Sequence, residues 1–166
     1  MKARLPELLA LPMLALPFAA TAGEASRADW LQAHNAERAL VGVPSLVWSA
    51  RAEKQAKAWA SELARSGRFE HSGVAGMGEN LYASGGSGSP SAAAAVAEWA
   101  SEKRFFDARL RRCERAWQEC GHYTQLVWRD TTAVGCAIAK GRKGRFDHLV
   151  VCNYLPQGNY LGEKPY

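Results

Sequence analysis

Four cysteines, all in the second half of a 166-residue chain, place the strongest constraint on how this sequence can fold. An even number of cysteines in an exported protein favours disulfides. Among the alternative pairings, we favour Cys113 with Cys120, which flank one short loop, and Cys136 with Cys152, which lie in two strand-like segments. A cysteine-ligated metal is the alternative, but the sequence contains no CxxC pair to support it.

The first 22 residues are interpreted as a secretory signal peptide. Lys2 and Arg4 precede a short apolar run from Leu8 to Ala20, and residues 20–22 read ATA, an A-x-A cleavage pattern. A membrane-spanning helix needs about 20 apolar residues, so the sequence predicts no transmembrane segment. We therefore expect residues 23–166 to form a single domain in a secreted, periplasmic or extracellular protein.

The start of this domain predicts a helix with a polar inward face. Ser26 and Asp29 have the spacing of a capping box, and the helix is expected to run from about residue 26 to residue 40. Helical periodicity then places four residues on one face, Leu31, His34, Asn35 and Arg38. Three polar side chains would therefore turn toward whatever Leu31 packs against.

A second helix is expected to follow Ser49 and to end near Arg65, where Gly67 supplies a stop. Glu53 falls on its polar face. Further along, two strand-like runs, AVGCAIAK and FDHLVVCNY, are separated by the turn-forming segment GRKGR, which predicts an antiparallel hairpin. Helices combined with a small antiparallel sheet indicate the α+β class.

A third helix is expected over about residues 90–104, with Ser89 as its cap and Pro90 in its first turn. Glu102 lies on its apolar face together with Ala95, Trp99 and Phe106. A carboxylate is rarely buried unless it is paired or binds a metal. Glu102 therefore requires a partner.

The segment EKRFFDARLRRCER, residues 102–115, is rich in arginine. We favour a solvated loop closed by a disulfide, with an anion-binding patch as the alternative. The segment does not interleave basic and aromatic residues in the way of a nucleic-acid-binding surface, so nucleic acid is not expected as a partner.

Three further polar residues stand in apolar or glycine-rich surroundings: His71 in FEHSG, Glu79 in GMGENLY and His122 in GHYTQLVW. Each alone is explained by ordinary hydrogen bonding in a loop or core. If these residues and Glu102 met in one pocket, imidazole and carboxylate groups would suit zinc or another divalent metal. Sequence spacing leaves both interpretations open.

Four motifs carry a resemblance to a known family: HNAER (34–38), GENLY (78–82), GHYTQLVW (121–128) and VVCNYLPQGNY (150–160). Together they resemble the CAP superfamily, which groups cysteine-rich secretory proteins, antigen 5 allergens and plant pathogenesis-related proteins, and the cysteines resemble the plant branch. The resemblance covers essentially all of residues 23–166 and implies a single CAP (SCP) domain, a three-layer α-β-α sandwich. It also implies a cleft containing His71, Glu79, Glu102 and His122.

The resemblance implies a secreted binding module in which His71 and His122 hold zinc or another divalent metal while Glu79 and Glu102 orient ligands or water. A sterol or a fatty acid is a further ligand that the resemblance implies. The alternative is a metal-dependent esterase or peptidase in which Glu79 or Glu102 acts as general base. The chain contains neither an HExxH helix nor a GxSxG elbow, so binding is favoured over catalysis. In a third interpretation, the polar cluster is purely structural.

Overall fold

The computed structural model describes residues 25–166 except residue 87 and residues 143–145. The expected signal peptide, residues 1–22, and most of the GRKGR turn lie outside the described residues. The elements follow in the order α1 (Arg27–Leu40), β1 (Val47–Trp48), α2 (Ala50–Ser66), β2 (Gly78–Ser84), α3 (Ala92–Ser101), η1 (Glu102–Phe105), β3 (Phe106–Asp107), β4 (Arg112–Cys113), η2 (Trp117–Glu119), α4 (Gly121–Leu126), β5 (Ala133–Lys140) and β6 (His148–Leu155).

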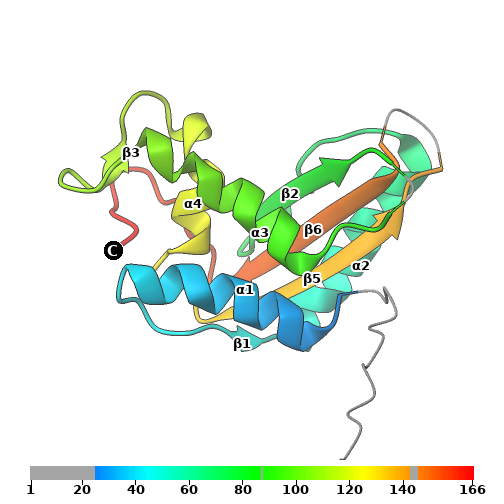
Figure 1. Ribbon diagram of the computed structural model, residues 1–166, viewed down its shortest axis with the longest axis horizontal. Coiled ribbons are helices and arrows are strands. Elements are labelled where there is room, and N and C mark those ends of the chain that lie inside the picture. The colour runs from blue at the N-terminus through cyan, green and yellow to red at the C-terminus, as the bar shows by residue number, and fades with distance from the viewer. Residues whose placement is uncertain (1–24, 87, 143–145) are drawn as a thin grey trace, which may run out of the picture.

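The main sheet has the strand order β1-β5-β6-β2 and lies between two helical layers. Helix α2 covers one face, and α1, α3 and α4 cover the other (Figure 1). Successive residues of β6 serve both layers, because Val150 and Cys152 pack toward α1 and α3 while Leu149 and Val151 pack toward α2. This arrangement confirms the expected α+β class and the α-β-α sandwich.

The expected hairpin and both expected disulfides are confirmed. Strands β5 and β6 pair antiparallel, with Cys136 directly opposite Cys152, and these two residues form a disulfide. The second disulfide joins Cys113 to Cys120. The sheet is mixed rather than purely antiparallel, since the short strand β1 pairs with β5 in parallel. Across the described residues, none of the helices is long and apolar enough to cross a membrane.

Local signals set the boundaries of the first two helices. The Ser26 side chain accepts a hydrogen bond from the Asp29 backbone, and the Asp29 side chain accepts one from the Ser26 backbone, which completes the capping box. The Ser49 side chain caps α2 by accepting a hydrogen bond from the Ala52 backbone, and Gly67 ends the helix in a left-handed conformation with φ of 74°. Glu53 departs from expectation because it is buried: it forms salt bridges with Arg27 and Lys57.

The third helix is shorter than expected. Ser91, not Ser89, is its cap, because the Ser91 hydroxyl accepts from the backbone of Ala94. The helix ends at Ser101, and residues 102–105 continue as the 3-10 turn η1. Glu102 therefore begins a new element that points toward α4, since η1 and α4 are in contact.

The polar inward face of α1 is confirmed, and its side chains are fully hydrogen-bonded. Trp30, His34 and Arg38 are buried one turn apart, whereas Leu31 and Asn35 are only partly buried. The Arg38 guanidinium donates to five backbone carbonyls, those of Pro44, Leu126, Trp128, Arg129 and Thr131. Pro44 lies in the loop after α1, Leu126 is the last residue of α4, and the other three lie in the loop after α4. One side chain therefore holds both loops and the end of α4 together.

Candidate functional site

The first expected site pair is formed by His71 and Glu79. Strand β2 carries Glu79, and the loop between α2 and β2 brings His71 back to it. His71 Nδ1 donates to Glu79 Oε1 at 2.9 Å. Ser72 completes the contact, with its backbone N–H 2.9 Å from Oε1 and its hydroxyl 2.6 Å from Oε2. The His71 side chain remains 60% exposed, while that of Glu79 is 7% exposed.

Two opposing effects act on the Glu79 carboxyl group. Burial is the largest single effect and raises its pKa, but hydrogen bonds from His71 and Ser72 together outweigh burial and lower the pKa below its ordinary value. Asn153 on β6 adds a longer hydrogen bond of 3.4 Å to Oε2. The carboxylate is thus held in its charged form as an acceptor for the imidazole.

The second expected pair is formed by Glu102 and His122. Glu102 starts η1, and His122 lies in the first turn of α4. His122 Nδ1 donates to Glu102 Oε1 at 2.6 Å, and the backbone N–H groups of His122 and Tyr123 donate to Oε2 at 2.9 and 3.2 Å. Glu102 therefore has the partner that its place on an apolar face required, and it also caps the start of α4.

Packing fixes the orientation of the His122 ring. Trp99 of α3 stacks on it with ring centroids 6.4 Å apart and an interplanar angle of 25°. The side-chain amide of Asn80 donates to the His122 carbonyl oxygen at 3.0 Å. Because Asn80 directly follows Glu79 in β2, this bond ties the strand that carries the first pair to the helix that carries the second.

The two pairs share a hydrogen-bonding pattern that leaves one nitrogen of each ring available. Each imidazole is oriented by a carboxylate at Nδ1, and within the described residues the Nε2 atoms of His71 and His122 form no hydrogen bond. Among the described side chains, no three ligand atoms from these four residues lie within 4.8 Å of one another. Each imidazole therefore keeps one ring nitrogen without a hydrogen bond, but the described residues do not preform a three-residue metal site here.

A different group of possible metal ligands is structural. His34, Cys136 and Cys152 have ligand atoms within 4.8 Å of one another. The two sulfurs form a disulfide, and both His34 nitrogens are used: Nδ1 donates to the Trp30 carbonyl at 2.7 Å and Nε2 accepts from the Tyr154 hydroxyl at 2.9 Å. Burial lowers the pKa of His34 to about 4. This group belongs to the core and binds no metal in its oxidised form.

Sequence reasoning missed two residues of the candidate site, Ser72 and Asn153. Ser72 supplies two hydrogen bonds to Glu79, and Asn153 lies directly opposite Glu79 in the β2–β6 pairing. The GENLY segment was not predicted to be a strand, so its pairing with β6 could not be predicted from the sequence. Glu98, the carboxylate that precedes Glu102 in the sequence, lies on α3 and is exposed.

Comparison with known proteins agrees with this fold. The family model described as "CAP: Cysteine-rich secretory protein family" matches residues 31–154. Pathogenesis-related protein 1A from Nicotiana tabacum is 44% identical over 141 residues, which cover 85% of this chain and 81% of the relative.

Two solved structures share the fold. Na-ASP-1 has a TM-score of 0.72 at 23% identity over 96% of this chain, which spans 46% of the length of that chain. NaASP2, solved with Zn2+, has a TM-score of 0.63 at 27% identity, and the match covers 84% of this chain and 84% of NaASP2. Because the family model and the tobacco relative both span most of its length, the chain belongs to the CAP family of cysteine-rich secretory proteins.

Proposed function

We propose that this protein is a secreted binding module that holds one divalent metal ion, zinc by the chemistry of its ligands, through Nε2 of His71 and Nε2 of His122. The observation that carries the proposal is the carboxylate at Nδ1 of each ring. Histidines that ligate metals commonly donate their second ring N–H to a carboxylate, which fixes the tautomer and leaves the other nitrogen as ligand. Glu79 and Glu102 take this supporting role.

The donor set suits zinc in chemical type. Neutral imidazole is a good ligand for zinc, and the relative NaASP2 was solved with Zn2+. Since no three of the four side chains converge, water or a bound ligand would fill the remaining coordination positions. Held by His71 and His122, such an ion would supply an electrophilic centre for an anionic or carbonyl group.

Binding is favoured over hydrolysis because neither carboxylate has an idle oxygen. Both oxygens of Glu79 accept hydrogen bonds, from His71, Ser72 and Asn153. Both oxygens of Glu102 are likewise used, by His122 and Tyr123. A general base for an attacking water would have to accept its proton in competition with these contacts. Sterol or fatty-acid binding, which the family resemblance implies, has no residue assignment in this chain and forms no part of the proposal.

We infer an extracellular or periplasmic location from two features. The amino-terminal sequence has the pattern of a signal peptide, and all four cysteines are paired in disulfides, which persist in oxidising compartments.

Zinc titration of the purified protein by calorimetry at neutral pH tests the metal proposal. We expect one site per chain in the wild type, loss of binding in His71→Ala and in His122→Ala, and weakening of roughly 10–100-fold in Glu102→Gln. Glu98→Gln is the matched control, because Glu98 is exposed on the neighbouring helix, and it should bind like the wild type. Zinc binding that survives in both histidine variants, or a wild type that binds none, would overturn the proposal.

A further inference from the structure

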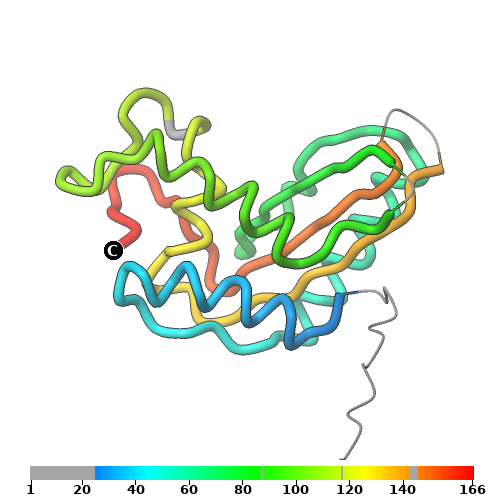
Figure 2. The backbone as a smooth tube through the Cα atoms, in the orientation of Figure 1, coloured from blue at the N-terminus to red at the C-terminus, as the bar shows by residue number. Residues whose placement is uncertain are grey.

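A pocket lies at the end of the molecule formed by the arginine-rich loop and the carboxyl-terminal tail. Figure 2 shows the tail running beside this loop and α4. The pocket has a volume of about 510 Å³. Residues 110–113 and Arg115 form one wall, residues 159–165 form the other, and the buried side chains of Thr124 and Trp128 lie between them. None of the four residues of the candidate metal site lines it.

Both walls are held in place by the fold. On the loop side, Asp107 Oδ1 accepts from the backbone of Arg109 and Leu110 at 2.8 and 2.9 Å, and the Cys113–Cys120 disulfide closes the loop. On the tail side, the backbone N–H of Arg129 donates to the Pro165 carbonyl at 2.7 Å. The Tyr166 ring then packs against Phe106 with centroids 5.7 Å apart. The pocket therefore exists before any ligand binds, which lowers the entropic cost of binding.

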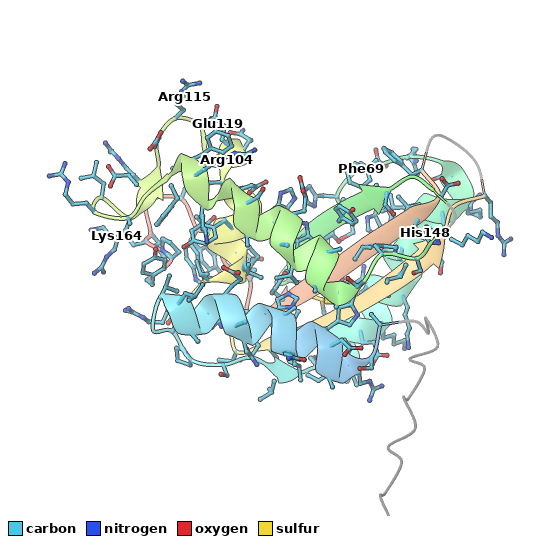
Figure 3. The ribbon with its side chains drawn as sticks, in the orientation of Figure 1. Phe69, Arg104, Arg115, Glu119, His148 and Lys164 are labelled. Atoms are coloured by element: carbon cyan, nitrogen blue, oxygen red, sulfur yellow. A yellow bond between two sulfur atoms is a disulfide. The ribbon has the colours of Figure 1, made fainter. Side chains whose placement is uncertain are left out.

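The charges of the lining are strongly unbalanced. Four cationic side chains, Arg111, Arg112, Arg115 and Lys164, face one carboxylate, that of Glu163. Figure 3 shows Arg115 on the loop and Lys164 on the tail at this same end of the molecule. Within the described residues, the salt bridges of arginine involve Arg27, Arg65 and Arg68, and none of the four cations of the pocket forms one.

Asp107 is a carboxylate that interacts with two arginines of the loop. Hydrogen bonding from the Leu110 backbone is the largest effect that lowers its pKa, and attraction to Arg109 and Arg112 contributes less. Its Oδ1 is already engaged by the turn. Asp107 attracts Arg112 but does not line the pocket, so the cations on the two walls outnumber the single lining carboxylate and remain available to an external anion.

An apolar surface borders these charges. Tyr160 packs against Trp128 with ring centroids 6.3 Å apart and is 46% exposed, and Leu161 is 89% exposed. Guanidinium groups match the oxygens of a phosphate in paired hydrogen bonds, while an exposed aromatic ring offers a flat contact for an organic group. We propose that this pocket binds a phosphate ester, with the phosphate between Arg111, Arg112 and Lys164 and the organic body against Tyr160 and Leu161.

Calorimetric titration of the disulfide-bonded protein with phenyl phosphate tests this proposal. The Arg111→Ser/Arg112→Ser double variant should bind roughly ten-fold or more weakly than the wild type, because charge-assisted hydrogen bonds are lost. Lys164→Ser, on the opposite wall, should also weaken binding. Arg51→Ser/Lys54→Ser is the control matched in net charge, since both residues are exposed on α2 and neither lines the pocket, and it should bind like the wild type.

Two further arms separate the parts and the source of the ligand. Tyr160→Ala should weaken the binding of phenyl phosphate and leave that of inorganic phosphate unchanged. Binding of phenyl phosphate in solution assigns a soluble ester, whereas binding only to vesicles that contain phosphatidic acid assigns a lipid headgroup, provided that the double variant loses it. The proposal is overturned if neither probe binds, or if Arg51→Ser/Lys54→Ser reduces binding as much as Arg111→Ser/Arg112→Ser does.

Discussion

His34 and His122 are both helical histidines whose Nδ1 donates a hydrogen bond, yet they lie in opposite chemical situations. His34 is completely buried, and Nε2 accepts from the Tyr154 hydroxyl. His122 keeps a side chain that is 33% exposed, and its Nε2 has no hydrogen bond within the described residues. The comparison teaches that the second ring nitrogen separates a structural histidine from one that is able to bind a ligand.

The same contrast extends to the groups around each histidine. Near His34, the Arg38 guanidinium is saturated by backbone carbonyls, and burial lowers its pKa to about 10. Near His122, the polar side chains form a hydrogen-bonded His–Glu pair at the edge of the core. Changes in the buried set should therefore reduce stability, and changes in the exposed pairs should mainly alter ligand binding.

The largest expected effect is that of Arg38→Met. Loss of the guanidinium leaves several buried carbonyls without a donor, and each unsatisfied group costs about 1–3 kcal/mol. We expect the free energy of unfolding to fall by about 3 kcal/mol or more, as measured by urea denaturation. A loss below 1 kcal/mol would show that water or a rearranged loop replaces the arginine. It would also contradict the view that the polar groups around His34 serve stability.

The next effect concerns acid sensitivity. His34 has a pKa of about 4 in the folded state and an ordinary pKa of about 6.5 when unfolded. Between these values only the unfolded state takes up the proton, so stability is complete above pH 6.5 and falls as the pH drops toward 4. The wild type should lose roughly 3 kcal/mol more over this range than His34→Gln. Urea denaturation of both proteins at about pH 6.5 and pH 4 measures these losses. Equal losses in the wild type and in His34→Gln would contradict the assignment of His34 as a neutral core residue.

A smaller effect is expected at the boundary between the two regions. Glu102→Ala removes the acceptor for two backbone N–H groups of α4, a loss similar to that of a helix cap, which costs about 1 kcal/mol. The same variant should lose most zinc affinity. Glu98→Ala, on the exposed surface, should change neither the melting temperature nor zinc binding. If both variants behave alike, Glu102 has no special role.

The smallest effect is expected in the arginine-rich loop. Arg111 and Arg112 are exposed and form no salt bridge within the described residues. Arg111→Ser and Arg112→Ser should each change the free energy of unfolding by less than about 0.5 kcal/mol. Thermal denaturation measures this directly. A loss several times larger would mean that these charges serve the fold and not a ligand.

Local chemistry explains which parts of the fold were predictable. Ser26, Ser49 and Gly67 act on the residues beside them, so the limits of α1 and α2 followed from sequence. Strand β2 did not, because its partner β6 lies far along the chain and the pairing of Glu79 with Asn153 has no local signal. Ser89 and Ser91 are both suitable caps by residue type, and the prediction placed the cap at Ser89, two residues before the serine that caps α3.

The candidate site was predictable only through family resemblance. Glu102 and His122 are 20 residues apart and His71 and Glu79 are 8 apart. The partners of each pair lie in different elements, so no helical or strand period within one element relates them. The need of Glu102 for a partner was deducible from its place on an apolar face. The identity of that partner depended on how η1 meets α4, which is a property of the whole fold.

The position of β6 has a consequence for the order in which the chain can fold. This last strand is inserted between β5 and β2, so β2 has no neighbour in the sheet until His148–Leu155 has been synthesised. Both core clusters also include residues of β6. Pairing between segments so distant in sequence is slow to form. A nascent chain that lacks its final strand therefore cannot complete either hydrophobic layer, and its commitment to the native state must wait for the carboxyl-terminal end.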